Sequence, residues 1–246
     1  MARVSVVTGG GTGIGRAVAA ELARNGDRVI IVGRRAEVLA AAAKGIDGDV
    51  RPIAADLGDP DDVARLRDEV ADAYGRVDVL VNNAGGNADL SDPGGDGLAD
   101  VARQWIGNFQ ANVLTVVLPT EALSGLLADD ARVVLVSSIA AIRGSGAGSY
   151  GSAKAALHPY AYNLATALGP RGITVNVVAP GFIEETEFFG GGLSDDRRAA
   201  LIDQTANHRP GTPADVAATI AWLTSPPAGH LTAQIIQVNG GAERGR

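Results

Sequence analysis

Short apolar runs alternate along this chain with longer segments that mix small apolar and charged residues. The runs are rich in β-branched residues, which is typical of strands buried on both faces of a sheet. Seven of them are centred on Val6, Ile31, Ile53, Leu80, Leu135, Val177 and Ile236. The segments between them have the length and composition of helices. The alternation predicts an α/β fold with one parallel sheet of seven strands, helices on both faces and right-handed crossovers.

A glycine-rich turn joins the first strand to the first helix. The run Val4–Val7 leads into Thr8-Gly-Gly-Gly-Thr-Gly-Ile-Gly15, and the helical pattern Arg16–Asn25 ends at Gly26. Backbone N–H groups at a helix N-terminus attract anions, and glycines let a phosphate approach closely. The spacing Thr-Gly-x-x-x-Gly-x-Gly differs from the G-x-G-x-x-G dinucleotide fingerprint. A tight turn is the alternative, but the flanking strand and helix favour a phosphate cradle.

Polar residues follow two later strands. Asn82-Asn83-Ala84-Gly85 comes after the run Val77–Val81, and Ser137-Ser138 comes after Val133–Val136. Ligands of open parallel sheets bind outside the carboxyl ends of the strands, and these residues lie there. Taken singly, the first is typical of a polar turn and the second of a helix cap. Because both motifs lie at the same edge of the predicted sheet, we favour a binding site there.

Tyr150 and Lys154 lie four residues apart in an Ala-rich segment. Helical spacing places both side chains on one face. A free tyrosine has a pKa near ~10, and a neighbouring ammonium favours the phenolate. We therefore expect Lys154 to lower the pKa of Tyr150, which makes the phenol a usable acid or base. Such a pair alone is more typical of a solvated surface, and the loops described above favour the catalytic interpretation.

Together these motifs resemble the short-chain dehydrogenase/reductase family, in its branch of about this length, over nearly the whole chain. Further matching pieces are Asp56-Leu57, Trp105 seven residues before Asn112, Asn176, Pro180-Gly181, Arg209–Asp215 and Val238–Gly241. The resemblance implies one doubly wound, Rossmann-type domain over residues 1–246. Within the family, the chain is similar to 3-oxoacyl-carrier-protein reductases and related ketoreductases.

The resemblance also implies a role for each matching residue. Tyr150 would be the acid/base, Lys154 would lower its pKa and hold the nicotinamide ribose, and Ser138 would polarise the carbonyl. Asn112 would support a proton-relay water. The implied cofactor-binding residues are Gly9, Gly13, Ile14, Gly15, Arg34, Asp56, Asn83, Ala84, Gly85, Tyr150, Lys154, Pro180, Gly181 and Ile183. Among these, the three loop glycines would cradle the pyrophosphate and Asp56 would meet the adenine.

Two adjacent serines compete for the catalytic position. Counting back from Tyr150 by the family's usual spacing selects Ser137, whereas aligning from the strand selects Ser138. We choose Ser138, because a shift of one residue turns a side chain to the other face of a strand. The loop Gly144–Ser149 would then be one residue shorter, and loops tolerate such changes.

Cofactor preference depends on the end of the second strand. An NAD site has an acidic residue about 20 residues past the glycine loop, to bind the ribose 2′-hydroxyl. Here Gly33 stands in that place and Arg34 and Arg35 follow. A guanidinium suits a 2′-phosphate, so we predict NADP(H) with Arg34 as its contact. Arg35 is either a second contact or a solvated charge.

The predicted function is hydride transfer between NADP(H) and a ketone or secondary alcohol. Substrates of 3-oxoacyl-thioester or polyketide type fit the resemblance. The alternative is a non-catalytic dinucleotide-binding or scaffold protein, since a fold does not fix a function. The intact Asn112, Ser138, Tyr150 and Lys154 argue against that alternative.

Two loops stand out by composition. The insertion at about residues 182–209 would, by the resemblance, cover the substrate as a lid. It carries apolar residues that line the site or pack the lid onto the body, namely Phe182, Ile183, Phe188, Phe189 and Leu193. We expect residues 184–200 to be mobile without substrate and to close over it. The Gly85–Gly97 loop, rich in Gly and Asp, is also expected to be mobile.

Composition limits the partners and the location. The net charge of −7 disfavours nucleic acid and anionic membranes, and no apolar run is long enough to span a bilayer. The chain has no cysteine, and its first strand starts close to Met1, so we expect a cytoplasmic protein without a signal peptide. Three scattered histidines predict no metal site.

Two segments carry apolar residues on most sides, Trp105–Leu127 and Ala155–Leu168. Helices of this kind are covered on both sides, and family members pair through these two, so we expect a homotetramer or homodimer. We expect Pro159 to kink the second helix or to interrupt one hydrogen bond. A carrier-protein partner would need a basic patch, to which five arginines could contribute: Arg103, Arg143, Arg197, Arg198 and Arg209.

Overall fold

Seven parallel strands form one sheet in the computed structural model, which describes residues 2–91, 95, 97–144, 148–190 and 193–244. Their order across the sheet is β3-β2-β1-β4-β5-β6-β7. The strands are β1 (Val4–Thr8), β2 (Arg28–Gly33), β3 (Val50–Ala54), β4 (Val77–Asn82), β5 (Leu127–Val136), β6 (Thr174–Pro180) and β7 (Ile235–Val238). Each predicted centre lies within its strand, so the predicted doubly wound α/β fold is confirmed.

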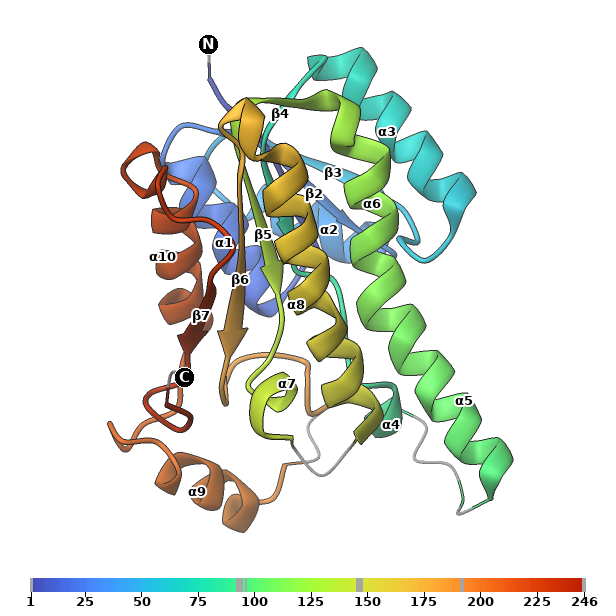
Figure 1. The fold of residues 1–246 in the computed structure, drawn as a ribbon, viewed down its shortest axis with the longest axis vertical. Coiled ribbons are helices and arrows are strands. Elements are labelled where there is room, and N and C mark those ends of the chain that lie inside the picture. Colours follow the sequence, from blue (N-terminus) through green and yellow to red (C-terminus); the bar gives the residue numbers. More distant parts are fainter. Residues whose placement is uncertain (1, 92–94, 96, 145–147, 191–192, 245–246) are drawn as a thin grey trace.

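Helices cover both faces of the sheet (Figure 1). They are α1 (Gly13–Arg24), α2 (Ala36–Lys44), α3 (Pro60–Tyr74), α4 (Ala88–Ser91), α5 (Leu98–Phe109), α6 (Thr115–Leu123), α7 (Ala140–Arg143), α8 (Gly148–Leu168), α9 (Asp195–Asp203) and α10 (Pro213–Leu223). One core joins the sheet to α3, α6 and α8, through residues such as Leu66, Leu123 and Leu157. The other core joins it to α1, α2 and α10, through residues such as Leu22 and Ile220.

All carboxyl ends of the strands lie at one edge of the sheet, because every pairing is parallel. Figure 1 shows α4, α7 and α9 gathered at this end of the molecule, opposite the chain N-terminus. The motifs that follow β1, β4 and β5 therefore meet at a single edge.

Three elements differ from the sequence prediction. Helix α1 begins at Gly13 rather than Arg16, so the last glycines of the loop form its first turn. The predicted helix Trp105–Leu127 is interrupted by a π-helical turn, η1 (Gln110–Leu114), between α5 and α6. The lid contains α9, whose residues are all partly or fully exposed and which the sequence pattern did not indicate. Helix α8 is continuous through Pro159, so the proline does not end it.

Parts of three loops lie outside the described residues. They are residues 92–94 and 96 of the Gly85–Gly97 loop, 145–147 of the Gly144–Ser149 loop, and 191–192 of the lid. The mobility predicted for the first and last of these loops stays a prediction. Within the described ranges, no helix has the length and apolarity to cross a membrane. No group of side chains suited to a metal ion occurs there either.

Candidate active site

The glycine-rich loop between β1 and α1 leaves no room for side chains. A Cβ atom at Gly15 would lie 2.2 Å from the carbonyl oxygen of Gly9, and Gly13 has a φ of 51°. The loop is fixed to the end of β4, where Asn83 Nδ2 donates to the Thr8 carbonyl (3.0 Å). Backbone N–H groups of Asn83 and Ala84 both donate to Thr8 Oγ1, at 2.9 Å each. The loop is thus a rigid cradle at a helix N-terminus, which suits a pyrophosphate.

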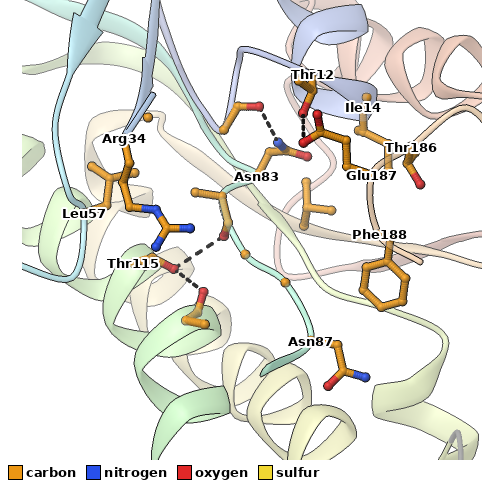
Figure 2. Close-up of a pocket in the computed structure, with 18 of the residues that line it drawn as sticks. Thr12, Ile14, Arg34, Leu57, Asn83, Asn87, Thr115, Thr186, Glu187 and Phe188 are labelled. Atoms are coloured by element: carbon orange, nitrogen blue, oxygen red, sulfur yellow. Dashed lines mark hydrogen bonds between the residues drawn. The ribbon is translucent and has the colours of Figure 1, made fainter. Parts of the chain in front are cut away.

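A cleft of about 1330 Å³ opens beside this loop at the carboxyl edge of the sheet (Figure 2). Typical small-ligand pockets hold about 300–1,000 Å³, so this cleft has room for a dinucleotide and a substrate. The predicted site residues that line it are Gly9, Gly13, Ile14, Arg34, Asp56, Asn83, Ala84, Gly85, Ser138, Tyr150, Lys154, Pro180, Gly181 and Ile183. Gly15 lies behind the loop and Asn112 lies behind Gly86, so these two do not line the cleft.

The two arginines after β2 differ in what they bind. Arg34 is exposed and lines the cleft, and among the described residues its guanidinium has no hydrogen bond or ion pair. Arg35 forms an ion pair with Glu187 of the lid at 2.6 Å. Gly33 adds no carboxylate at this position, so this end of the cleft is lined by the Gly33 backbone and the Arg34 guanidinium. Asp56 accepts a hydrogen bond from Gly58 N (2.9 Å) at the same end.

Tyr150 is buried at the N-terminal end of α8, 7% exposed. Burial raises the pKa of its phenol to about 12, and the neighbouring Ser138 hydroxyl lowers it by less. The expectation that Lys154 lowers the pKa of Tyr150 is therefore wrong for the ligand-free protein. The cause is desolvation, which disfavours the phenolate and outweighs the other contributions.

Lys154 lies one turn further along α8 and is also buried. Its Nζ donates to the carbonyl oxygen of Val136 at 2.9 Å. Burial lowers the pKa of this ammonium to about 8. A Cβ atom at Gly85 would lie 3.0 Å from Lys154 Nζ and 2.7 Å from Asn112 Oδ1. Both groups therefore border Gly85, and the glycine is needed for their approach.

The two serines after β5 have different partners. Ser138 lies beside Tyr150, and its Oγ accepts from Ala140 N at 3.1 Å. Ser137 is 3% exposed, and its Oγ is 3.1 Å from the Lys154 carbonyl oxygen and 3.0 Å from His158 Nε2. The structure brings Ser138 to the tyrosine hydroxyl, whereas Ser137 binds the next turn of α8.

Asn112 lies in the π-helical turn and is fully buried. Its Nδ2 donates to the carbonyl oxygens of Gly86 (2.7 Å) and Asn108 (3.0 Å), and its Oδ1 accepts from Gly86 N (3.2 Å). A π turn opens the usual hydrogen-bond ladder of a helix and often marks a functional site. Here it lets Asn112 reach across to the loop after β4.

Sequence reasoning missed a polar network beneath this site. Asn108 Nδ2 donates to Asp89 Oδ1 (2.8 Å) and Ser149 Oγ (3.0 Å), and Ser149 Oγ donates to Asp89 Oδ2 (2.6 Å). Ser149 immediately precedes Tyr150, and Asn108 lies one turn before Asn112. The sequence signal was Asn108 itself, which is four residues before Asn112. The network joins the α4 loop, α5 and α8.

The lid places an aromatic ring against the tyrosine. The ring centroids of Phe188 and Tyr150 are 5.5 Å apart, and those of Phe188 and Phe189 are 4.9 Å apart. Phe189 in turn contacts Phe182 at 5.9 Å. Phe188 and Phe189 line the cleft, and Phe188 also packs the lid against Tyr150 of α8. Figure 2 shows Phe188 directed into the cleft.

This chain is similar to several known proteins. A family model described as enoyl-(acyl carrier protein) reductase matches residues 9–243. The 3-oxoacyl-[acyl-carrier-protein] reductase FabG of Escherichia coli is 31% identical, with 97% of this chain and 96% of that protein covered. A short-chain dehydrogenase/reductase from Brucella melitensis has a TM-score of 0.90 at 30% identity, covering 99% and 97% of the two chains. The RhlG/NADP active-site complex of Pseudomonas aeruginosa has a TM-score of 0.89 at 32% identity, covering 98% and 96%.

Proposed function

The chain belongs to the short-chain dehydrogenase/reductase family of oxidoreductases, and we propose that it transfers hydride between NADP(H) and a ketone or secondary alcohol. The observation that carries the proposal is the pair of hydroxyls at the cleft, where the Ser138 side chain lies beside Tyr150. They lie near a glycine cradle and the exposed Arg34, at the edge where parallel sheets bind ligands.

In this proposal the two hydroxyls hold the substrate oxygen. Ser138 donates a hydrogen bond to the carbonyl, and Tyr150 donates a second one and then its proton. The raised pKa of Tyr150 keeps the phenol protonated at neutral pH, which is the form that reduction needs. When bound, the nicotinamide supplies the hydride. Lys154 and Asn112, which both border Gly85, form the route by which the phenol regains a proton.

The cofactor-binding residues are proposed from the same geometry. Gly9, Gly13 and Gly15 shape the cradle for the pyrophosphate, and Arg34 is the free cation for a 2′-phosphate. Ile14, Asn83, Ala84, Gly85, Pro180, Gly181 and Ile183 complete the walls, with Asp56 at the adenine end. A solved relative binds NADP, which supports the choice of this cofactor over NAD.

The substrate class we propose to test first is a 3-oxoacyl thioester, the class named for the relative from Escherichia coli. A carrier-bound substrate has less support. Arg103, Arg198 and Arg209 each form an ion pair within the chain, with Asp100, Glu184 and Asp215. Arg143 is bonded to the Ala242 carbonyl (2.9 Å) and Gln204 (2.7 Å). An acidic partner would therefore have to compete with contacts that these four arginines already make within the chain.

We also propose a homodimer or homotetramer in the cytoplasm. Large apolar side chains are exposed on α5, among them Trp105 (49%), Ile106 (58%) and Phe109 (48%). Helix α8 packs beside α5 and exposes Tyr162. Exposed apolar surface of this kind is typical of subunit interfaces. The absence of cysteine suits a reducing compartment.

The test is a panel of 3-oxoacyl thioesters, ketones and quinones with NADPH, followed at the nicotinamide absorbance. We expect turnover with NADPH and tighter binding of NADPH than NADH. A bidentate charged contact contributes about 1.5–3 kcal/mol, roughly tenfold or more in affinity, which Arg34→Ala should remove. NADPH binding without turnover on any substrate would favour the non-catalytic alternative. Equal affinities for the two cofactors would refute the cofactor assignment.

A further inference from the structure

A carboxylate of the lid lies at the cofactor end of the cleft. Arg35 Nη2 donates to Glu187 Oε2 at 2.6 Å, and Arg35 Nη1 is 3.4 Å from Glu187 Oε1. Thr12 Oγ1 also donates to Glu187 Oε2, at 3.4 Å. Figure 2 shows Thr12 and Glu187 joined on one side of the cleft, with Arg34 across from them.

The two residues that hold Glu187 belong to the elements that border the predicted phosphate positions. Thr12 is in the glycine loop, at the N-cap of α1. Arg35 follows the end of β2, at the N-cap of α2. All three side chains line the cleft. A guanidinium fork and a hydroxyl are groups that a phosphate would also use. Glu187 therefore occupies anion-binding groups that face the cofactor.

The lid is seated closely on the glycine loop at this point. A Cβ atom at Gly13 would lie 3.3 Å from Cγ2 of Thr186, the residue before Glu187. Glu185 has a φ of 58°, a left-handed conformation that is uncommon for a residue with a side chain. The backbone turns there, and it directs Glu184 to Arg198 and Glu187 to Arg35.

The contact is suited to exchange. The side chains of Arg35 and Glu187 are 57% and 60% exposed, and exposed ion pairs are weak and easily replaced by another anion. The hydrogen bond from Arg35 lowers the pKa of Glu187, so its carboxylate is ionised at neutral pH. Arg35 is therefore occupied in the ligand-free protein, although a dianionic phosphate would bind it more strongly.

We propose that Glu187 is an internal anion that competes with the cofactor's 2′-phosphate for Arg35 and so sets the preference for phosphorylated cofactor. The inference rests on the proposed function, since it assumes a nicotinamide nucleotide in this cleft. It assigns Arg35 as a second phosphate contact beside Arg34. It also couples cofactor binding to the lid, because a phosphate on Arg35 releases Glu187, and a nucleotide without that phosphate leaves the ion pair in place.

The experiment compares Glu187→Gln with Glu184→Gln, a matched variant that removes one lid carboxylate whose partner is Arg198. Calorimetry measures the affinity of adenosine 2′,5′-bisphosphate and of 5′-AMP, which differ by the 2′-phosphate. We expect Glu187→Gln to raise the preference for the bisphosphate by about 1.5–5-fold over the wild type, the size of one exposed charge pair. Glu184→Gln should leave that preference unchanged. Thermal melts check that both variants are folded.

A double variant identifies the partner. Arg35→Ala should weaken bisphosphate binding. Adding Glu187→Gln to it should give no further change, because the guanidinium for which Glu187 and the phosphate compete is then absent. A preference that stays at the wild-type value in Glu187→Gln would overturn the inference and leave the proposed function standing. The same holds if the two lid variants behave alike. If neither wild type nor variants bind any of these nucleotides or NADPH, the proposed function fails and the inference with it.

Discussion

Desolvation disfavours the charged forms of Tyr150 and Lys154, and so moves their pKa values in opposite directions. Burial raises the pKa of Tyr150 to about 12 and lowers that of Lys154 to about 8. Helical spacing was sufficient to predict that Tyr150 and Lys154 lie on one face of a helix. The direction of the tyrosine shift was not predictable, because it depends on how much water the surrounding loops exclude.

A buried ammonium with one carbonyl partner costs stability, so Lys154→Met should stabilise the ligand-free protein while abolishing turnover. The folded pKa lies below the unfolded value, so the unfolded chain binds more protons between about pH 8 and 10.5 and stability rises with pH there. We expect a gain of about 1–3 kcal/mol at pH 7, reduced by the Val136 carbonyl left unpaired, and a smaller gain at pH 9.5. Urea unfolding at both pH values measures it. A loss of stability at pH 7, or a gain that grows with pH, would contradict the assignment.

The two serines give a second prediction at this scale. Ser138→Ala removes the hydroxyl beside Tyr150 that we propose donates to the substrate carbonyl, and loss of one such donor typically lowers kcat by about 10²–10³. Ser137→Ala removes a hydroxyl that binds Lys154 and His158 instead, so most of the turnover should remain. Steady-state kinetics on the two variants decide. The opposite ranking would place the site at Ser137.

Among the elements, the π-helical turn η1 does most to position the site. It brings Asn112 to Gly86, and Asn108 one turn earlier binds Asp89 and Ser149. Asn108 also accepts from Ala88 N at 3.0 Å. The same side chain thus links the loop after β4 to the start of α8, where Tyr150 lies.

We expect Asn108→Leu to lose about 1–3 kcal/mol of stability, because Asp89 and Ser149 lose a buried donor. It should also lower kcat about tenfold or more with a smaller change in KM, since misplacing Tyr150 affects the chemical step. Thr120→Val is the control. Thr120 of α6 is buried and accepts from Asn82 Nδ2 at 2.9 Å, and neither residue lines the cleft, so its loss should cost stability alone. Equal kcat values in the two variants would show that Asn108 is only structural.

The regular elements were predictable and the irregular ones were not, for one physical reason. Strand and helix periodicity is local, so the sheet, α1 and α8 could be located from apolar patterning. The π turn and the contact between Glu187 and Arg35 depend on residues far apart in sequence, whereas α9 buries no residue and so has no apolar face that a pattern could indicate. The glycine loop was identifiable from the sequence because its backbone segments pack so closely that only glycine fits there.

At the scale of the whole molecule, the exposed apolar residues are unevenly placed. Leu98, Trp105, Ile106 and Phe109 belong to α5, which extends away from the sheet in Figure 1. Trp222 is similarly exposed (53%) but lies on α10, on the other face. The two tryptophans therefore offer a matched pair for testing which face is covered by another subunit.

Trp105→Arg should dissociate the proposed oligomer, because a charge would replace an aromatic anchor of the interface. Trp222→Arg should leave its mass unchanged. Sedimentation velocity over a range of protein concentrations measures both. A monomeric wild type, or dissociation by the α10 substitution alone, would contradict the placement of the interface on α5 and α8.

The central claim is that Tyr150 donates the proton in an NADPH-dependent carbonyl reduction. Tyr150→Phe keeps the ring that contacts Phe188 and removes only the hydroxyl. The most direct measurement is the turnover of this variant on the best substrate of the panel, with NADPH binding measured on the same sample. The account predicts unchanged NADPH affinity and a loss of turnover of about 10²–10⁴. A variant that binds NADPH and still reduces the substrate at a comparable rate would contradict it.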